Sequence, residues 1–267
     1  MRNRLTQIGF SSQKLRYAWL AQAARLCLAG VPVLEAVQEL RAMLGGVAGD
    51  SLTGRGSRER ALTLLRKIWF TPDKDLVALR DTGLNLLRGL PRKNHIAIHW
   101  GMVMASYPFW ARVGGETGKL LRLQSSASAR HVRRRLVEHY GDREIVARAT
   151  RNVLRSFIEW GVLQETSVKG IYTSGLSFAI DQVEVIAWLV EAFLHAHPNG
   201  SVALRTVLDS TSLFPFRLSP ISADHLVAVS GRLDVLRQDL DQDLIMLRPV
   251  RQPGRTESLP ATKGGGS

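Results

Sequence analysis

Three arginines recur along one stretch of the sequence at a spacing that would place them on one side of a helix. Arg148, Arg151 and Arg155 lie three and four residues apart in GDREIVARATRNVLRSFIEWGVL, residues 141–163. At about 100° per residue, the three side chains fall within a sector of about 60°. Because a guanidinium group binds phosphate oxygens through paired hydrogen bonds, this face predicts the binding of a polyanion.

The opposite side of the same predicted helix is apolar, and it predicts the face that packs against the protein. Its residues are Val146, Ala149, Val153, Phe157 and Trp160. A helix fixed in this way can present its other side to the major groove of DNA, which phosphates flank on both sides. We expect Asn152 and Ser156 to lie near that exposed side and to form hydrogen bonds there. The alternative is a solvated helix face, partly neutralised by Glu144 and Glu159.

A second arginine-rich segment, RHVRRRL, precedes this helix. Val132, Leu136 and Tyr140 form its apolar stripe, which leaves the arginines outward or on the flanks. In a helix-turn-helix the earlier helix commonly crosses the phosphate backbone. The turn between the helices adds Arg143, and the following hairpin adds Lys169. The predicted nucleic-acid-binding residues are therefore Arg130, Arg133, Arg134, Arg135, Arg143, Arg148, Arg151, Asn152, Arg155 and Lys169.

These segments belong to a region, residues 112–175, that predicts three helices followed by a hairpin. Helices are expected at 116–124, at 128–140 and over the stretch quoted first, and short strands at 162–166 and 171–174. The stretch EHYGDREIVARATRNVLRSFIEWGVLQETSVKGIYTS resembles the core of a winged helix-turn-helix, with FIEWGVL where such domains run from the recognition helix through a glycine into the first wing strand. The resemblance covers about residues 116–175 and implies a DNA-binding domain with Lys169 at the tip of its wing.

A broader resemblance covers residues 10–175. The arrangement is similar to the small helical DNA-binding proteins of bacteriophage-exclusion (BREX) operons, in which a helical front part precedes a domain that ends in a helix, a glycine and a short hairpin. The front part here includes IAIHWGMVMASYPFWARVGGETGKLLRL. The resemblance implies a non-enzymatic accessory role in bacterial phage defence, with other subunits of the same operon as partners.

Residues 1–111 predict an all-helical N-terminal domain, since helical periodicity recurs and no strand pattern occurs before residue 160. Pro32 opens the second helix, and Thr71 with Pro72 predicts the cap and first turn of a later one. Helices are expected at 12–29, 33–44, 58–69, 72–89 and 94–106, with a flexible loop at 45–57.

Residues 176–250 predict a second winged-helix-like domain. The pattern predicts three helices followed by a hairpin, which is the order of a winged helix. The elements are a long amphipathic helix from about residue 183, a short helix at 201–208, a helix capped by Ser222 and the terminal hairpin RLDVLRQDLDQDLIMLRP. Residues 251–267 have the composition of a disordered tail. The predicted fold class is therefore mainly α, with a helical N-terminal domain followed by one or two winged helices that carry short β-hairpin wings.

Lysine and arginine are distributed unevenly along the chain. The net charge of +13 divides into +9 for residues 1–111, +6 for 112–175, −4 for 176–250 and +2 for the tail. An excess of positive charge favours polyanionic partners, which are nucleic acids or anionic membranes. No apolar run approaches the roughly 20 residues that span a bilayer, and the N-terminus lacks the apolar region of a secretory signal. These features predict a cytoplasmic, nucleoid-associated protein without a membrane partner.

Motifs of catalysis and metal binding are missing from the sequence. It has no P-loop, no nucleophile elbow and no suitably flanked pair of carboxylates, which predicts that the protein is not an enzyme. Cys27 stands alone, so neither a disulfide framework nor a cysteine-based metal site is expected. His95 and His99 have the spacing of zinc ligands on a helix, but no third ligand follows, and packing beside Trp100 is the favoured interpretation. No metal and no cofactor are expected.

The sequence therefore predicts a non-enzymatic protein that grips duplex DNA mainly through arginine–phosphate contacts. Two alternatives remain open at this point. One is a protein–protein assembly module of a multi-subunit complex, because winged helices also serve as docking units and residues 176–250 are acidic. The other is an RNA-binding protein, since phosphate contacts alone do not separate RNA from DNA.

Overall fold

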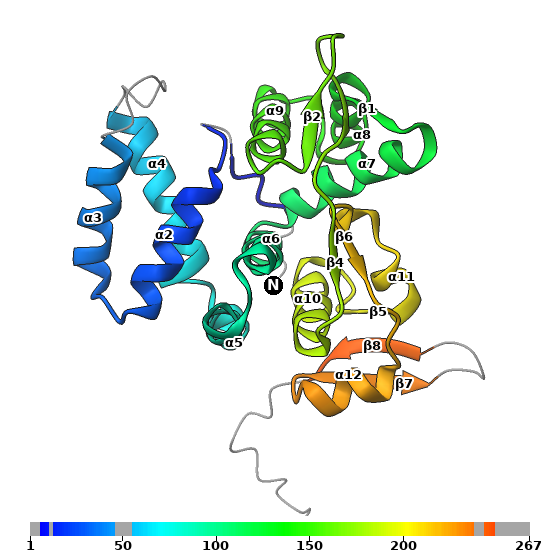
Figure 1. The fold of residues 1–267 in the computed structure, drawn as a ribbon. Coiled ribbons are helices and arrows are strands. Elements are labelled where there is room, and N and C mark those ends of the chain that lie inside the picture. The colour runs from blue at the N-terminus through cyan, green and yellow to red at the C-terminus, as the bar shows by residue number, and fades with distance from the viewer. Residues whose placement is uncertain (1–5, 11–12, 46–54, 238–242, 249–267) are drawn as a thin grey trace, which may run out of the picture.

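The structure is a computed structural model whose described residues form a mainly helical fold with three small sheets (Figure 1). The described residues are 6–10, 13–45, 55–237 and 243–248. The predicted mainly α class is confirmed. The predicted tail at 251–267 lies outside the described residues, as does most of the predicted loop at 45–57. None of the described helices has both the length and the apolar character needed to cross a membrane.

The N-terminal part consists of helices joined by short turns. Its elements are α2 (Tyr17–Leu28), α3 (Val33–Gly45), α4 (Arg55–Leu65), the π-helical turn η1 (Arg66–Phe70), η2 (Lys74–Leu76), α5 (Val77–Gly89), η3 (Arg92–Asn94) and α6 (His95–Ser106). The helix predicted at 72–89 begins later than expected. The Thr71 N–H binds the Arg66 carbonyl and ends η1, so Thr71 is not the predicted cap. Asp73 instead precedes η2, and α5 begins at Val77.

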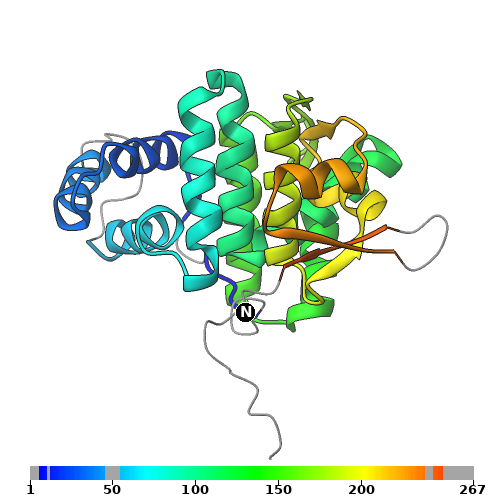
Figure 2. The same ribbon diagram turned by 90° about the horizontal axis from the view of Figure 1, so that it is seen from below.

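Helices α6 and α10 (Val183–Ala196) form the centre of the molecule. Every residue of α6 from 96 to 106 is buried, as is every residue of α10 from 185 to 195. A helix that is buried on all sides belongs in a core. Seen end-on in Figure 1 and lengthwise in Figure 2, α5, α6 and α10 run alongside one another.

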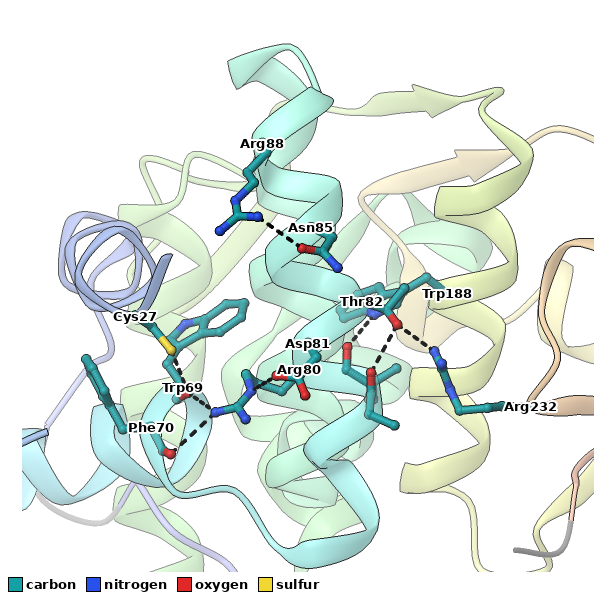
Figure 3. A network of polar contacts seen from close by, with 12 residues as sticks. Cys27, Trp69, Phe70, Arg80, Asp81, Thr82, Asn85, Arg88, Trp188 and Arg232 are labelled. Atoms are coloured by element: carbon teal, nitrogen blue, oxygen red, sulfur yellow. Dashed lines mark hydrogen bonds and ion pairs between the residues drawn. The ribbon is translucent and has the colours of Figure 1, made fainter. Parts of the chain in front are cut away.

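The indole ring of Trp188 on α10 fills the space that two glycines leave on its neighbours. A Cβ atom on Gly83 of α5 would lie 2.9 Å from the ring, and one on Gly101 of α6 would overlap it. The ring nitrogen donates a hydrogen bond of 2.8 Å to the carbonyl of Leu79 on α5 (Figure 3). Trp188 therefore fixes the spacing of three helices.

An ion pair between a buried carboxylate and a partly exposed arginine ties the C-terminal part of the chain to the same helices. Glu191 of α10 is 2% exposed and accepts hydrogen bonds of 2.7 and 2.9 Å from the guanidinium of Arg232. Arg232 also donates to the hydroxyl of Thr82 on α5 at 2.9 Å (Figure 3). On the other side of α5, Arg80 donates to the carbonyl of Trp69 at 3.0 Å. These contacts join α5 both to α10 and to the end of η1.

Residues 108–174 form a unit of three helices and a three-stranded sheet. Its elements are α7 (Pro108–Gln124), β1 (Ser126–Ser128), α8 (Ala129–Tyr140), α9 (Glu144–Glu159), β2 (Leu163–Glu165) and β3 (Ile171–Ser174). The strands lie in the order β1-β3-β2 with antiparallel neighbours, so the predicted hairpin is confirmed. Strand β1 corrects the expectation that no strand precedes residue 160. The helix predicted at 116–124 is the second half of α7, which begins at Pro108. The expected domain boundary after residue 111 falls inside α7.

Residues 183–247 repeat this order of elements, with η4 and β6 inserted between the second and third helices. After α10 come β5 (Ser201–Ala203), α11 (Leu204–Leu208), η4 (Thr211–Leu213), β6 (Phe216–Leu218), α12 (Ala223–Val229), β7 (Leu233–Arg237) and β8 (Asp243–Leu247). The sheet order β5-β8-β7 matches that of the first unit, and the predicted terminal hairpin is confirmed. Ser222 caps α12 as predicted, by accepting from the N–H of His225. The helix predicted at 201–208 starts only at residue 204, because the three preceding residues pair with β8.

One hydrophobic core runs through the described part of the chain. Buried apolar side chains from Ile8 to Ile245 form a single cluster. At the junction of the two units, Gly118 of α7 leaves room for the backbone of η4, and the ring nitrogen of Trp100 donates to the carbonyl of Ser212 at 3.2 Å. A parallel pair of strands, β4 (Phe178–Ile180) and β6, lies in the second part of the chain. The segments that the sequence divides into domains therefore share one core.

Replacing Gly101 with Ala tests the contact at the centre of this core. The added Cβ overlaps the Trp188 ring, so we expect the free energy of unfolding to fall by about 1–3 kcal/mol in spite of the better helix propensity of Ala. Chemical denaturation measures the change. Gly89→Ala is the matched control, because no atom lies within 4 Å of its added Cβ, and it should not lose stability. Equal stability of the two variants would contradict the packing described.

Candidate nucleic-acid interface

Helix α9 is docked by its apolar face, as the sequence predicts. Val146, Ala149, Val153 and Phe157 are fully buried, and Trp160 is 5% exposed. The ring of Phe157 stacks on Trp100 of α6, with centroids 4.8 Å apart and planes inclined by 22°. The predicted stripe is confirmed, and the helix is held directly against the central helix of the fold.

The opposite face of α9 forms one wall of an open groove of about 1220 Å³. The first turns of α8 and the turn between β2 and β3 form other walls, and α4 contributes one residue. The groove therefore lies between the arginine face and the hairpin that follows it. Seven predicted residues line it: Arg130, Arg133, Arg148, Arg151, Asn152, Arg155 and Lys169.

The groove is strongly cationic. Its described lining includes six arginines and one lysine, but Glu165 is the only carboxylate among those lining residues. Arg148 lies 3.5 Å from Glu144, and Arg133 lies 3.8 Å from Asp142, so two of the arginines are partly neutralised. Within the described residues, no acidic group lies within ion-pair distance of the remaining ones, which are Arg60, Arg130, Arg151, Arg155 and Lys169.

Three predicted residues do not line the groove. Arg134, Arg135 and Arg143 are exposed but lie outside its lining. Arg135 forms an ion pair of 3.1 Å with Glu138, one turn further along α8.

Asn152 and Ser156 occupy a different place from the one expected. Ser156 is fully buried, and its hydroxyl accepts a 2.7 Å hydrogen bond from the N–H of Leu15. The amide of Asn152 is half-buried and donates to the carbonyl of Phe10 at 2.7 Å. The expectation that Ser156 lies on the exposed side is wrong, because an N-terminal segment covers this flank of α9. Asn152 lines the groove, but its NH₂ group already has a partner within the protein.

The covering segment comprises the described residues between 8 and 17, and further bonds hold it to the end of α9. The ring nitrogen of Trp160 donates to the carbonyl of Leu15 at 2.9 Å, and the N–H of Tyr17 donates to the carboxylate of Glu159 at 2.9 Å. Burial raises the pKa of Glu159, although the hydrogen bond from Tyr17 and the nearby cations oppose this shift. The segment is therefore fixed along one flank of α9.

This segment extends the positive potential of the groove. Burial lowers the pKa of Lys14, and the charges of Arg16 and Arg155 lower it further. Lys14 is therefore close enough to Arg155 to be affected by its charge, and Arg16 lies near Lys14. A polyanion bound along α9 would gain from both.

Arg60 of α4 is the groove cation that the sequence reasoning missed. It is exposed and lines the groove, although α4 belongs to the N-terminal helices. The segment RGSRERALTLLRK is visibly basic, but nothing in its spacing indicates which helix face meets α9. Only the tertiary packing of the N-terminal helices brings Arg60 to this site.

The two histidines and the cysteine considered in the sequence make contacts within the protein. His99 is fully buried between the rings of Tyr17 and Trp69, and burial lowers its pKa to about 3, so it is neutral. A ring nitrogen of His95 lies 2.9 Å from the carbonyl of Leu90. Cys27 is half-buried, and burial raises the pKa of its thiol. In the described ranges, no group of three or more His, Cys, Asp or Glu side chains is arranged to hold a metal ion.

Replacing Ser156 with Ala tests whether the N-terminal segment depends on α9. The change leaves the buried N–H of Leu15 without an acceptor, so we expect the free energy of unfolding to fall by about 1–3 kcal/mol. Hydrogen exchange at the Leu15 amide should become faster than in the wild type. Ser167→Ala, at an exposed position of the β2–β3 turn, is the control and should change neither quantity. Unchanged exchange at Leu15 would show that Ser156 does not hold the segment.

Comparisons with known proteins identify no family for this chain. No family model matches the chain, and neither a curated protein nor a solved structure matches it. The functional assignment therefore depends on the groove, its charge and the elements that form it.

Proposed function

We propose that the protein binds duplex DNA in the cationic groove and does so without catalysing a reaction. The observation that carries this proposal is the convergence of seven cationic side chains, from α4, α8, α9 and the β2–β3 turn, on one open groove. Neutralising phosphates with such groups releases condensed counterions, which is the main source of sequence-independent affinity for DNA.

The order of elements supports a winged helix as the binding unit. Helices α7, α8 and α9 followed by the β2–β3 hairpin have the order of that fold, with α9 in the place of the recognition helix and Lys169 in the wing. The repeated sheet order supports a second winged-helix-like unit over residues 183–247. An accessory role in a bacterial phage-defence system, in the cytoplasm and near the nucleoid, is proposed from the sequence resemblance alone.

The chemistry of α9 favours contacts to phosphates over contacts to base edges. Arg148, Arg151 and Arg155 supply its exposed charge, whereas the amide of Asn152 already donates within the protein. Arginines along a groove wall fix a duplex by its backbone, and backbone contacts carry no direct sequence information. We therefore propose general affinity for duplex DNA instead of recognition of one sequence.

A second candidate function, protein docking, is favoured by the outward side of α12. At the position in the second unit that α9 has in the first, α12 exposes Asp224, His225 and Val229 but no arginine. Leu236 of the adjacent β7 is 47% exposed. Asp224 forms an ion pair with Arg237 of β7, so its charge is partly neutralised. A surface of paired charges and exposed apolar groups suits a protein partner better than a phosphate backbone, and it supports a division of roles between the two units.

Replacing Arg148, Arg151 and Arg155 together with Ala tests the arginine face. We expect the affinity for duplex DNA to fall by at least tenfold, and the slope of log K against log salt to decrease by about one unit for each arginine that contacts a phosphate. Fluorescence anisotropy with a labelled duplex, over a salt series, measures both quantities.

The matched control for that variant is Arg92→Ala, Arg205→Ala and Arg217→Ala combined. It removes the same charge from exposed positions outside the groove and should leave the slope nearly unchanged. Equal loss in both triple variants would contradict binding at the groove. Salt-independent binding by the wild type would contradict the electrostatic basis of the proposal, and stronger competition by duplex RNA would redirect it to RNA.

Replacing Arg60 with Ala tests whether α4 takes part in the same contact. We expect the magnitude of the salt slope to decrease by about one unit, because Arg60 faces the groove without an acidic partner among the described residues. Arg66→Ala, an exposed arginine just after α4 that does not line the groove, is the control. Identical slopes for these two variants would exclude α4 from the interface, but they would not contradict the proposed contact of α9 with DNA.

A further inference from the structure

A second cavity, of about 320 Å³, lies between α7, the C-terminal ends of α8 and α10, and the residues that lead into η4. It shares no lining residue with the cationic groove. Its volume is at the lower end of the range for pockets that bind small molecules. The cavity is therefore separate from the proposed DNA site and suited to a single-ring compound.

One part of the cavity is apolar and flat. Phe193 of α10 lines it, and its ring stacks on the imidazole of His197 with centroids 5.6 Å apart and planes inclined by 20°. Tyr140, at the end of α8, contributes a half-buried ring. Stacked and parallel rings of this kind favour a flat ligand over a branched one.

The polar part carries a net positive charge. Arg112 and Lys119 of α7 line the cavity together with Glu116, and no ion pair to Arg112 occurs within the described ranges. Nδ1 of His197 is buried and has no hydrogen-bond partner there. Two cations and one carboxylate leave one positive charge for a ligand to neutralise, and a buried imidazole nitrogen without a partner favours a ligand that can pair with it.

We propose that this cavity binds a small organic anion, a flat ring that carries one carboxylate. The ring lies against Phe193 and His197, and the carboxylate pairs with the guanidinium of Arg112. Arginine suits this contact because its planar group binds a carboxylate through two parallel hydrogen bonds. His139, on the last turn of α8, completes the polar side of the site.

The pKa values of His139 and His197 depend on the charge in the cavity, so they can be used to detect a bound anion. Burial, and then the charge of Arg112, lower the pKa of both His139 and His197 below the usual value. A bound carboxylate offsets the charge of Arg112, so it should raise both values. The other ionisable groups that line the cavity are Glu116, Lys119 and Tyr140.

Benzoate is the probe that tests this proposal, in the full-length protein. The Hε1 signals of His139 and His197 should shift with benzoate at about 10 mM, the range in which fragments of this size bind, and the pKa of both should rise. Benzamide, which has the same shape without the charge, should bind at least tenfold more weakly. His131, on α8 but outside the cavity lining, should not shift, which separates this site from benzoate binding to the groove.

Arg112→Gln should weaken benzoate binding at least tenfold, whereas Arg217→Gln, outside the cavity, should bind like the wild type. Thermal unfolding checks that both variants remain folded. The proposal is overturned if no shift occurs at His139 and His197, if benzamide binds as well as benzoate, or if Arg112→Gln changes nothing. Equal binding of inorganic phosphate would overturn the requirement for a flat ring.

Discussion

Helix α10 approaches α5 and α6 closely because Gly83 on α5 and Gly101 on α6 leave room for the ring of Trp188 on α10. Any side chain at Gly101 would collide with that ring, so the spacing of the central helices depends on these residue types. Helix α6 connects the N-terminal helices to α7, and α10 begins the second unit. The spacing of the helices that join the N-terminal part to the second unit therefore depends on a contact that tolerates little change in volume.

The cationic groove depends on that frame for its shape. Helix α9 packs against α6 through Phe157, and α4 brings Arg60 to the same groove from the N-terminal helices. Gathering cations that lack acidic partners is unfavourable by itself, because like charges repel in the folded state. The shared core offsets this repulsion and fixes the backbone elements that carry the arginines before any partner arrives. The binding surface is therefore already formed, and only the exposed side chains lose conformational freedom on contact with a phosphate backbone.

Spacing within one helix was enough to predict both faces of α9, since each face follows from the residues of that helix alone. It was not enough to predict what covers the flank. Asn152 and Ser156 bind a segment more than 140 residues earlier in the chain, and Arg60 also reaches the groove through packing of segments far apart in the sequence. Strand β1 was missed because SAS, residues 126–128, shows no alternation and becomes a strand only by pairing with β3.

The segment along the flank of α9 also bears on the order of events in folding. The backbone groups of Leu15 and Tyr17 find their partners on residues 141 to 145 positions later in the chain. During synthesis these groups remain hydrated until α9 has left the ribosome, and closing so long a loop is slow compared with forming a helix. Leu15 and Tyr17 are therefore made long before α9, yet these hydrogen bonds can form only after α9 has formed.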